Sequence, residues 1–257
     1  MIIAQISDTH ICLGADDGEC RAADLERTLA DINALDPAPD VIIHTGDVVH
    51  GGRREDYAVA ASLLAKARAP LYVAPGNRDD RDNLRHSLSR WVPAADSRLL
   101  DYAVEDFPVR LVAVDSVSGT SNKGDFSPER ARRLLTLIEA EPHKPTVVFM
   151  HHPPFTVQVG PDPLNFVTTE AMATLQGALE RSARVVAVFC GHVHRSTCGR
   201  IGSIPVMVAP CTATTLRKGD FPPQMRTRPI YHLHRLNSAC ELVTELRIVA
   251  DASGSSG

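Results

Sequence analysis

The sequence predicts an α/β protein with two mixed β-sheets flanked by helices. Five short apolar runs, each typical of a buried parallel strand, occur between residues 2 and 189, with helical segments between them. After residue 194 short strands follow one another without helices, which predicts a second, partly antiparallel sheet. The 257 residues are enough for one large domain, and nothing marks a linker. We therefore expect a single domain over residues 1–251 and a disordered, small and polar tail over 252–257.

The spacing of apolar residues defines the expected elements. Strands are predicted over residues 2–6, 41–44, 71–74, 147–150 and 185–189, and in the C-terminal part over 196–200, 205–209, 230–236 and 241–249. Helices are predicted over residues 21–35, 57–67, 127–138 and 168–179. Ser127 before Pro128 is typical of an N-cap followed by the first helical residue, and Thr168 or Thr169 should cap the last of these helices.

Metal-binding side chains stand at the end of each of the five apolar runs. These side chains are Asp8, His10, Asp47, Asn77, His151, His192 and His194. Because sites in open α/β sheets form at the carboxyl ends of the strands, the five loops are expected to converge on one polynuclear metal centre. Gly46, Gly76 and Gly191 precede ligands, where a sharp turn beside an ion needs a residue without Cβ. A dinuclear metallohydrolase is the leading hypothesis.

The residue types restrict the chemistry of this expected centre. Asp8 and His10 are two residues apart, as are His192 and His194, so in an extended segment the members of each pair would point to the same side. Oxygen and nitrogen ligands without thiolate suit Mn, Fe, Zn or Co and do not choose among them. One carboxylate can bridge two ions about 3.5–4 Å apart, the separation that clamps both the attacking and the leaving oxygen of a phosphoryl group.

The ordered motifs resemble the signature of a known superfamily. The pattern Asp8-x-His10, Gly46-Asp47, Gly76-Asn77-x-Asp79, His151 and Gly191-His192-x-His194 is similar to that of the calcineurin-like metallophosphoesterases. The resemblance spans residues 2 to about 210 and implies a four-layer αββα sandwich. The compact size and the segments Pro75-Gly76-Asn77 and His151-His152-Pro153-Pro154 further resemble class III cyclic nucleotide phosphodiesterases and the related glycerophosphodiester phosphodiesterases.

This resemblance implies a function and a role for each ligand. Asp8, His10 and His194 are expected to bind one ion, Asn77, His151 and His192 the other, and Asp47 to bridge them. The implied cofactors are two divalent or trivalent transition-metal ions, and a hydroxide bound to them is the implied nucleophile. The implied substrate is a small-molecule phosphate ester, most of all a phosphodiester of the cyclic nucleotide or glycerophosphodiester type. The alternatives are a phosphomonoesterase and a catalytically silent, metal-stabilised interaction scaffold.

Two further residues are assigned to catalysis. The superfamily usually has a histidine after the metal-binding asparagine, whereas this chain has Arg78, whose guanidinium stays protonated and cannot donate a proton to a leaving group. Arg78 could still hold a phosphate oxygen, although a solvated or salt-bridged arginine beside Asp79 or Asp80 is an equal alternative. His152 is expected to support the site through a hydrogen bond.

Other polar residues near the motifs have plainer interpretations. His44 is expected to be a buried histidine with its hydrogen bonds satisfied, Asp115 to organise a loop, and Cys211 to fill space. His50 could approach the substrate or have a structural role in its loop. The loop from Thr212 to Arg228 contains four cationic side chains that could meet an anionic substrate or be solvated.

Composition agrees with a soluble enzyme. The net charge of −4 does not favour nucleic-acid binding, and six cysteines without C-x-x-C spacing indicate neither a zinc knuckle nor a disulfide framework. No apolar run approaches the roughly 20 residues that span a bilayer, so no membrane association is expected. The N-terminus enters a strand directly, without the pattern of a signal peptide, so a cytoplasmic location is expected. A homo-oligomer is left open.

Overall fold

The computed structural model describes residues 1–94, 98–158 and 163–250. The expected tail at 252–257 lies outside the described residues. The strands are β1 (Ile2–Ile6), β2 (Val41–His44), β3 (Leu71–Val73), β4 (Tyr102–Val104), β5 (Arg110–Val114), β6 (Thr146–Met150), β7 (Val185–Cys190), β8 (Thr197–Ile201), β9 (Ile204–Val208), β10 (Ile230–Leu236) and β11 (Leu242–Ile248). The helices are α1 (Gly18–Asn33), α2 (Arg54–Leu64), α3 (Arg81–Ser87), α4 (Pro128–Glu139), α5 (Thr169–Glu180) and α6 (Pro223–Arg226), with a 3₁₀ turn η1 (Thr214–Leu216).

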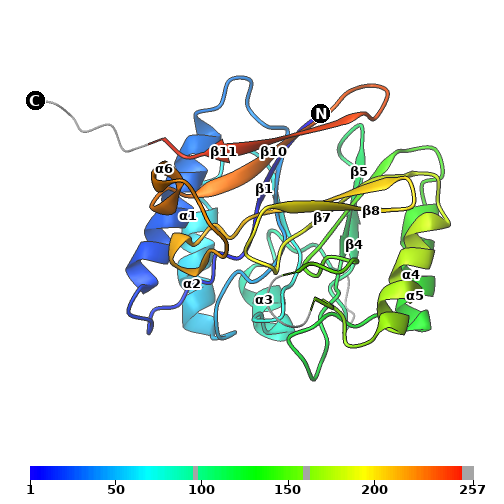
Figure 1. Cartoon of the computed structure of the whole chain (residues 1–257), viewed down its shortest axis with the longest axis horizontal. Helices are drawn as coiled ribbons and strands as arrows, with labels where there is room; N and C mark the ends of the chain where they lie inside the picture. Colours follow the sequence, from blue (N-terminus) through cyan, green and yellow to red (C-terminus); the bar gives the residue numbers. More distant parts are fainter. Residues whose placement is uncertain (95–97, 159–162, 251–257) are drawn as a thin grey trace, which may run out of the picture.

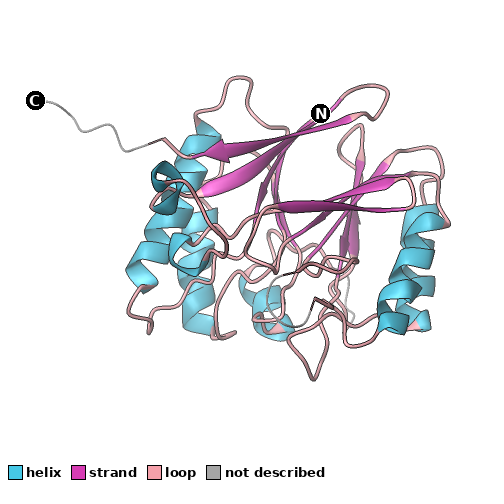
Figure 2. Ribbon diagram, viewed as in Figure 1, coloured by secondary structure: helices cyan, strands magenta, loops and turns pink. Residues whose placement is uncertain are grey.

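Two mixed sheets pack face to face between layers of helices, which confirms the predicted αββα sandwich (Figures 1 and 2). The first sheet has the order β11-β10-β1-β2-β3 and the second β4-β5-β6-β7-β9-β8. Helices α1 and α2 cover the outer face of the first sheet, and α4 and α5 cover that of the second (Figure 2). Because β1, β2 and β3 are parallel, as are β5, β6 and β7, the carboxyl ends of the central strands share one edge in each sheet.

The C-terminal strands correct one expectation. They do not form a second sheet of their own, because β10 pairs antiparallel with β1 and extends the first sheet together with β11. The hairpin of β8 and β9 instead extends the second sheet, with β9 parallel to β7. Between β9 and β10 lie η1 and α6, so this part of the chain is also not free of helices.

Local sequence explains the helix starts. Ser127 caps α4, its Oγ accepting from the backbone N–H of Arg130 at 3.3 Å, and Pro128 is the first helical residue, as predicted. Thr168 is the cap of α5, and its Oγ1 accepts from Ala171 N at 3.0 Å. The expected helices over 21–35 and 57–67 each begin three residues earlier, and end two and three residues earlier, as α1 and α2. Neither has a side-chain cap hydrogen bond to fix its start.

Polar side chains join the two sheets across their interface. The Gln5 side-chain amide, on β1, donates to the carbonyl of Cys190 on β7 at 2.8 Å. Its amide oxygen accepts from His234 Nε2 at 2.9 Å, and the His234 ring stacks on Phe189 with centroids 3.8 Å apart. Thr244 Oγ1 lies 2.8 Å from His234 Nδ1 and donates to it. Every polar atom of this buried group therefore has a partner, which limits the cost of burial.

Candidate metal centre

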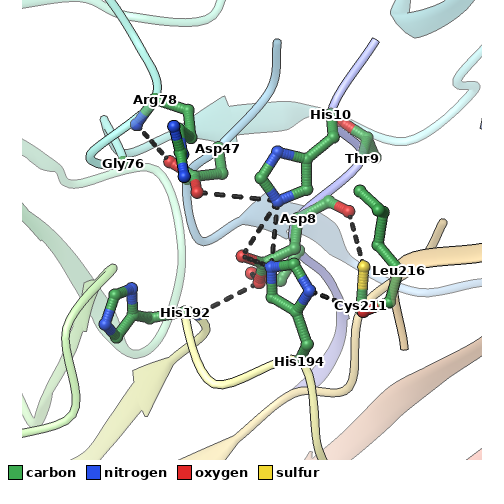
Figure 3. Close-up of polar contacts among 12 residues, drawn as sticks. Asp8, Thr9, His10, Asp47, Gly76, Arg78, His192, His194, Cys211 and Leu216 are labelled. Carbon is green, nitrogen blue, oxygen red and sulfur yellow. Dashed lines mark hydrogen bonds and ion pairs between the residues drawn. The ribbon is translucent and has the colours of Figure 1, made fainter. Parts of the chain in front are cut away.

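All five motif loops meet at the carboxyl edge of the two sheets, as the sequence predicts. The seven candidate ligand side chains come from the segments that follow β1, β2, β3, β6 and β7. Figure 3 shows Asp8, His10, Asp47 and His194 turned toward one another at this edge. They form one group of potential metal ligands, and His151, His152 and His192 form another.

The first group presents an acceptor that no donor occupies. Asp8 Oδ2 accepts from Ser7 Oγ at 2.5 Å and from the backbone N–H of His192 at 3.0 Å. Its other oxygen, Oδ1, is buried without a hydrogen bond to the described residues and faces His194 Nε2 at 3.3 Å. The Nε2 atoms of His10 and His194 are 3.0 Å apart. Two imidazole nitrogens and an orphaned carboxylate oxygen around one point form a donor set that suits a cation.

In the second group Asn77 completes the arrangement. The Oδ1 atom of Asn77 lies 3.0 Å from His151 Nε2 and 2.9 Å from His192 Nδ1. The rings of His151 and His192 stand nearly perpendicular, with centroids 5.0 Å apart. One amide oxygen and two imidazole nitrogens thus converge beside the first group.

Asp47 lies between the two groups. Its Oδ2 is 3.6 Å from His10 Nε2 in the first group and 3.4 Å from His151 Nε2 in the second. Its Oδ1 accepts from the backbone N–H of Arg78 at 2.7 Å, which fixes the carboxylate orientation. This is the position that a bridging carboxylate requires.

The backbone at the ligands differs from the extended conformation assumed from the sequence. Asp8, His10, Asp47, His192 and His194 all have φ between 45° and 75°. This left-handed region is rare for residues other than glycine, and non-glycine residues in it cluster at functional sites. The extended segment on which the same-side argument depended is therefore absent, and the left-handed turns direct His192 to the second group and His194 to the first.

Glycines allow the loops to approach one another. Gly46 has φ +94°, and a Cβ there would lie 2.7 Å from Gly76 N. A Cβ on Gly76 would lie 2.1 Å from Asp47 N. Both glycines are therefore required for close contact between the loops after β2 and β3, as the motif predicted.

Backbone carbonyls orient the ligand rings. His151 Nδ1 donates to Thr45 O at 2.8 Å, and His194 Nδ1 donates to Leu216 O at 2.8 Å. Each bond leaves the Nε2 lone pair of that ring directed into the site, the usual arrangement for histidine ligands. His10 Nδ1 lies 3.3 Å from His50 Nδ1. His50 therefore packs against a candidate ligand and is itself half-buried.

Electrostatics in the metal-free protein also indicate a cation site. Burial lowers the pKa of His194, but the Asp8 carboxylate outweighs it and brings the pKa to about 11. Burial also lowers the pKa of His151, but the Asp47 carboxylate outweighs this effect and raises the pKa to about 9. Burial would raise the pKa of Asp8, yet His194 and His10 hold it well below its usual range. The raised pKa values of His151 and His194 show that Asp47 and Asp8 stabilise positive charge at these two rings.

His152 does not present a free nitrogen to the site. Its Nε2 donates to Asn122 O at 3.1 Å, and its Nδ1 lies 2.8 Å from Ser116 Oγ, which donates to it. The ring is buried, with centroids 4.9 Å from His151 and 4.5 Å from His192. Among the described residues, Asn77 is accordingly a better third ligand than His152.

Arg78 lies at the open rim. Its backbone binds Asp47, while its side chain is exposed and makes no hydrogen bond or ion pair with the described residues. Neither Asp79 nor Asp80 pairs with it. Asp79 instead accepts from Gly76 N at 2.9 Å and Tyr57 Oη at 3.0 Å, and Asp80 caps α3. The salt-bridged alternative for Arg78 is excluded within the described residues.

The plainer interpretations of three residues are confirmed. His44 is buried, with Gly46 N donating to its Nδ1 at 3.2 Å and Thr9 Oγ1 3.0 Å from its Nε2. Asp115 accepts a bidentate pair from Arg81 at 2.6 and 2.8 Å and organises its loop. Cys211 is buried, and its thiol donates to Asp8 O at 3.0 Å (Figure 3). Burial raises the pKa of the Cys211 thiol, which disfavours a nucleophilic thiolate.

The cationic loop from 212 to 228 is largely structural. Arg217 donates to the carbonyls of Met225 and Arg228 at 2.6 and 3.1 Å, and Arg226 Nε donates to Phe221 O. Lys218 is exposed, and its backbone N–H donates to His194 O at 3.0 Å. The hydrogen bonds of Arg217 and Arg226 hold together the loop that contains Leu216, whose carbonyl orients His194. The contact of Lys218 with the ligand residue His194 is made by its backbone N–H.

The sequence did not reveal several residues that hold the ligands. Arg21 is buried on α1, and its Nη1 donates to the carbonyl of His10 at 3.1 Å. Ser7 and Ser116 bind the Asp8 carboxylate and the His152 ring. Ser7 could have been noticed from its position beside the first motif. Arg21 could not, because an arginine on a helix is normally solvated.

Comparison with known proteins agrees with the geometry. The family model of the calcineurin-like phosphoesterases matches residues 1–196. A probable glycerophosphodiester phosphodiesterase of Arcobacter nitrofigilis is 30% identical, over 99% of this chain and 95% of its own. A glycerophosphodiester phosphodiesterase of Enterobacter lignolyticus is 32% identical, over 82% and 77%. A 3',5'-cyclic adenosine monophosphate phosphodiesterase of Pseudomonas aeruginosa is 26% identical, over 98% and 91%.

A solved structure shows the same fold. The dimetal phosphatase from Danio rerio superposes with a TM-score of 0.74 at 13% identity, covering 98% of this chain and 97% of its own. In the described residues no helix is both long and apolar enough to cross a membrane. From the matched family model, the identities and the two groups of His and Asp side chains, we conclude that the chain belongs to the calcineurin-like metallophosphoesterase superfamily.

Proposed function

We propose that the protein hydrolyses small-molecule phosphodiesters of the cyclic nucleotide or glycerophosphodiester type. The observation that carries the proposal is the Asp47 carboxylate, which faces both His10 and His151. Relatives named for both diester classes, at 26–32% identity, support it. The ligands would be Asp8, His10 and His194 for one ion and Asn77, His151 and His192 for the other, with Asp47 shared.

The chain's own residues would orient the reaction. Two bound transition-metal ions, drawn from Mn, Fe, Zn or Co, would supply an activated water and neutralise the phosphoryl oxygens. The Thr45 and Leu216 carbonyls keep two imidazoles in the tautomer that presents Nε2. His152 supports the rings of His151 and His192 by packing, itself fixed by Ser116.

Arg78 would hold the substrate phosphate. Its guanidinium is exposed and its backbone N–H is bonded to Asp47, which supports a contact between the fork and a phosphate held by the two ions. The guanidinium cannot give a proton, so the enzyme should prefer esters whose leaving group needs none.

A hydrolysis screen tests the proposed reaction. Protein reconstituted with Mn or Zn should cleave an aryl phosphodiester, a cyclic nucleotide or a glycerophosphodiester, and chelator should abolish the activity. Faster cleavage of matched monoesters would favour a phosphomonoesterase. Bound metal without turnover on any ester would indicate the scaffold and contradict the proposal.

Variants of Arg78 test its role. Arg78→Ala should keep the metal content and lower kcat/KM by roughly 10- to 1000-fold, equivalent to about 1.4–4 kcal/mol of transition-state stabilisation. Arg78→His should raise activity on poor alkoxide leaving groups relative to good aryl ones, because imidazole can donate a proton. The matched control is Arg68→Ala, an exposed arginine before the opposite end of β3. Wild-type rates for Arg78→Ala across the leaving-group series would identify a solvated arginine.

A further inference from the structure

Away from the metal centre, a hollow of about 490 Å³ is lined by guanidinium groups. Arg81, Arg98, Arg130 and Arg133 line it, together with one carboxylate, Glu129. Ligand pockets for small molecules occupy roughly 300–1000 Å³. The lining is therefore of a size and a charge that suit a small organic anion.

Two of these guanidinium groups are held close together. Arg81 Nη2 donates to the carbonyl of Val117 at 2.7 Å, and Arg130 Nη2 donates to the same oxygen at 3.1 Å. Arg130 also donates to the carbonyl of Asp125 at 2.6 Å. Both forks are thus fixed before any ligand arrives, which reduces the entropy lost on binding.

The compensation of charge is uneven among the four arginines. Arg81 pairs with Asp115 and Arg133 with Asp101. Arg130 bonds to carbonyl oxygens only, and the exposed Arg98 makes no hydrogen bond or ion pair with any described residue. Among the described residues neither Arg130 nor Arg98 has a carboxylate partner, and two such like charges around one hollow are stabilised when an anion enters it.

Two short segments of the chain connect residues that line or hold the hollow with residues at the metal centre. Arg81 follows Asn77 by four residues at the start of α3, and its partner Asp115 precedes Ser116, whose hydroxyl fixes His152. The loop that begins at Asp115 therefore has the arginine-lined hollow on one side and the His152 ring on the other.

We propose that this hollow binds the phosphate group of a small organic phosphomonoester. Phosphate oxygens match the paired N–H groups of arginine, and the remaining volume accommodates the organic part. The proposal does not depend on the reaction at the metal centre. The ligand occupies a second anion site, distinct from the substrate position beside Arg78.

Calorimetric titration of the metal-loaded protein with inorganic phosphate tests this assignment. Wild type should show two binding events, one at the metal centre and one at the hollow. Arg98→Ala should weaken the second event at least about tenfold, which corresponds to about 1.4 kcal/mol. The matched control Arg132→Ala removes an exposed arginine of α4 outside the hollow and should leave both events unchanged.

A second probe separates organic phosphates from the free ion. Phenylphosphonate, which has no ester bond to hydrolyse, should bind the second site at least as tightly as phosphate, because the hollow has space for the ring. Phosphate binding that Arg98→Ala leaves unchanged, whether the wild type shows one event or two, would overturn the site. Exclusion of phenylphosphonate from a site that binds phosphate would overturn its assignment to organic ligands.

Discussion

Buried histidines that face a carboxylate at the strand ends, and buried histidines within the strands, have pKa values shifted in opposite directions. At the strand ends, carboxylates raise the pKa of His151 to about 9 and that of His194 to about 11, although burial opposes both shifts. Within the strands, burial lowers the pKa of His44 to about 3 and that of His234 well below its usual value. His44, His151 and His234 are fully buried, and the His194 side chain is 13% exposed.

The partners of the rings explain this difference. The strand histidines meet hydroxyls, amides and rings, which satisfy a neutral imidazole. The strand-end histidines meet Asp8 and Asp47, whose charge attracts a cation of any kind. A buried histidine therefore indicates a metal site only when an unsatisfied carboxylate shares its surroundings.

The largest effect is expected at Asp47. Asp47→Ala removes the charge shared by both groups, so both metal content and turnover should fall, with kcat/KM reduced more than about 1000-fold. Elemental analysis and steady-state kinetics measure this. The matched control is Asp115→Ala, which removes an equally buried carboxylate that binds Arg81, and should reduce stability but leave metal content unchanged. Full occupancy of both ions in Asp47→Ala would show that the carboxylate does not bridge.

Exchanging the two kinds of histidine for alanine should separate metal binding from folding. His194→Ala should lower metal content and should also destabilise the chelator-treated protein, because the buried Asp8 carboxylate loses its charged partner. His234→Ala should leave metal content intact and cost about 2–4 kcal/mol, because Gln5 Oε1 loses its donor and Phe189 its stacking partner. Urea unfolding and elemental analysis test both. Loss of metal in His234→Ala with wild-type stability would contradict the distinction.

A smaller effect concerns pH. Burial lowers the pKa of His232 to about 4, against about 6.5 in an unfolded chain. As pH falls through 6.5 the unfolded state takes up this proton first, so stability should decrease between pH 6.5 and 4 and stay constant above. The loss from this residue between pH 7 and 5 is about 2 kcal/mol. Urea midpoints of chelator-treated wild type and His232→Asn at the two pH values test it, and equal pH-dependent losses would contradict it.

The sequence predicted the fold and the positions of the site loops because strand-end ligands follow a simple rule. Polar ligands after apolar runs must emerge at the carboxyl edge of a parallel sheet, and they do so after β1, β2, β3, β6 and β7. The elements β4, β5, α3, α6 and η1 were not among those predicted, and all but β5 are too short or too polar to show a clear apolar period.

The details within the site were beyond sequence reasoning for physical reasons. The groups that orient His151 and His194 are backbone carbonyls of Thr45 and Leu216, which every residue type possesses. The divergence of His192 and His194 depends on left-handed backbone at non-glycine residues, which the sequence pattern does not specify.

Five of the seven candidate ligands have left-handed backbone, and each such residue costs an L-amino acid about 1 kcal/mol or more. A glycine at any of these positions would relax the chain but remove a donor atom. Selection for heat tolerance and selection for turnover therefore oppose each other at the same five positions. We expect heat-adapted relatives to gain their robustness elsewhere in the sandwich and to retain the strained positions unchanged.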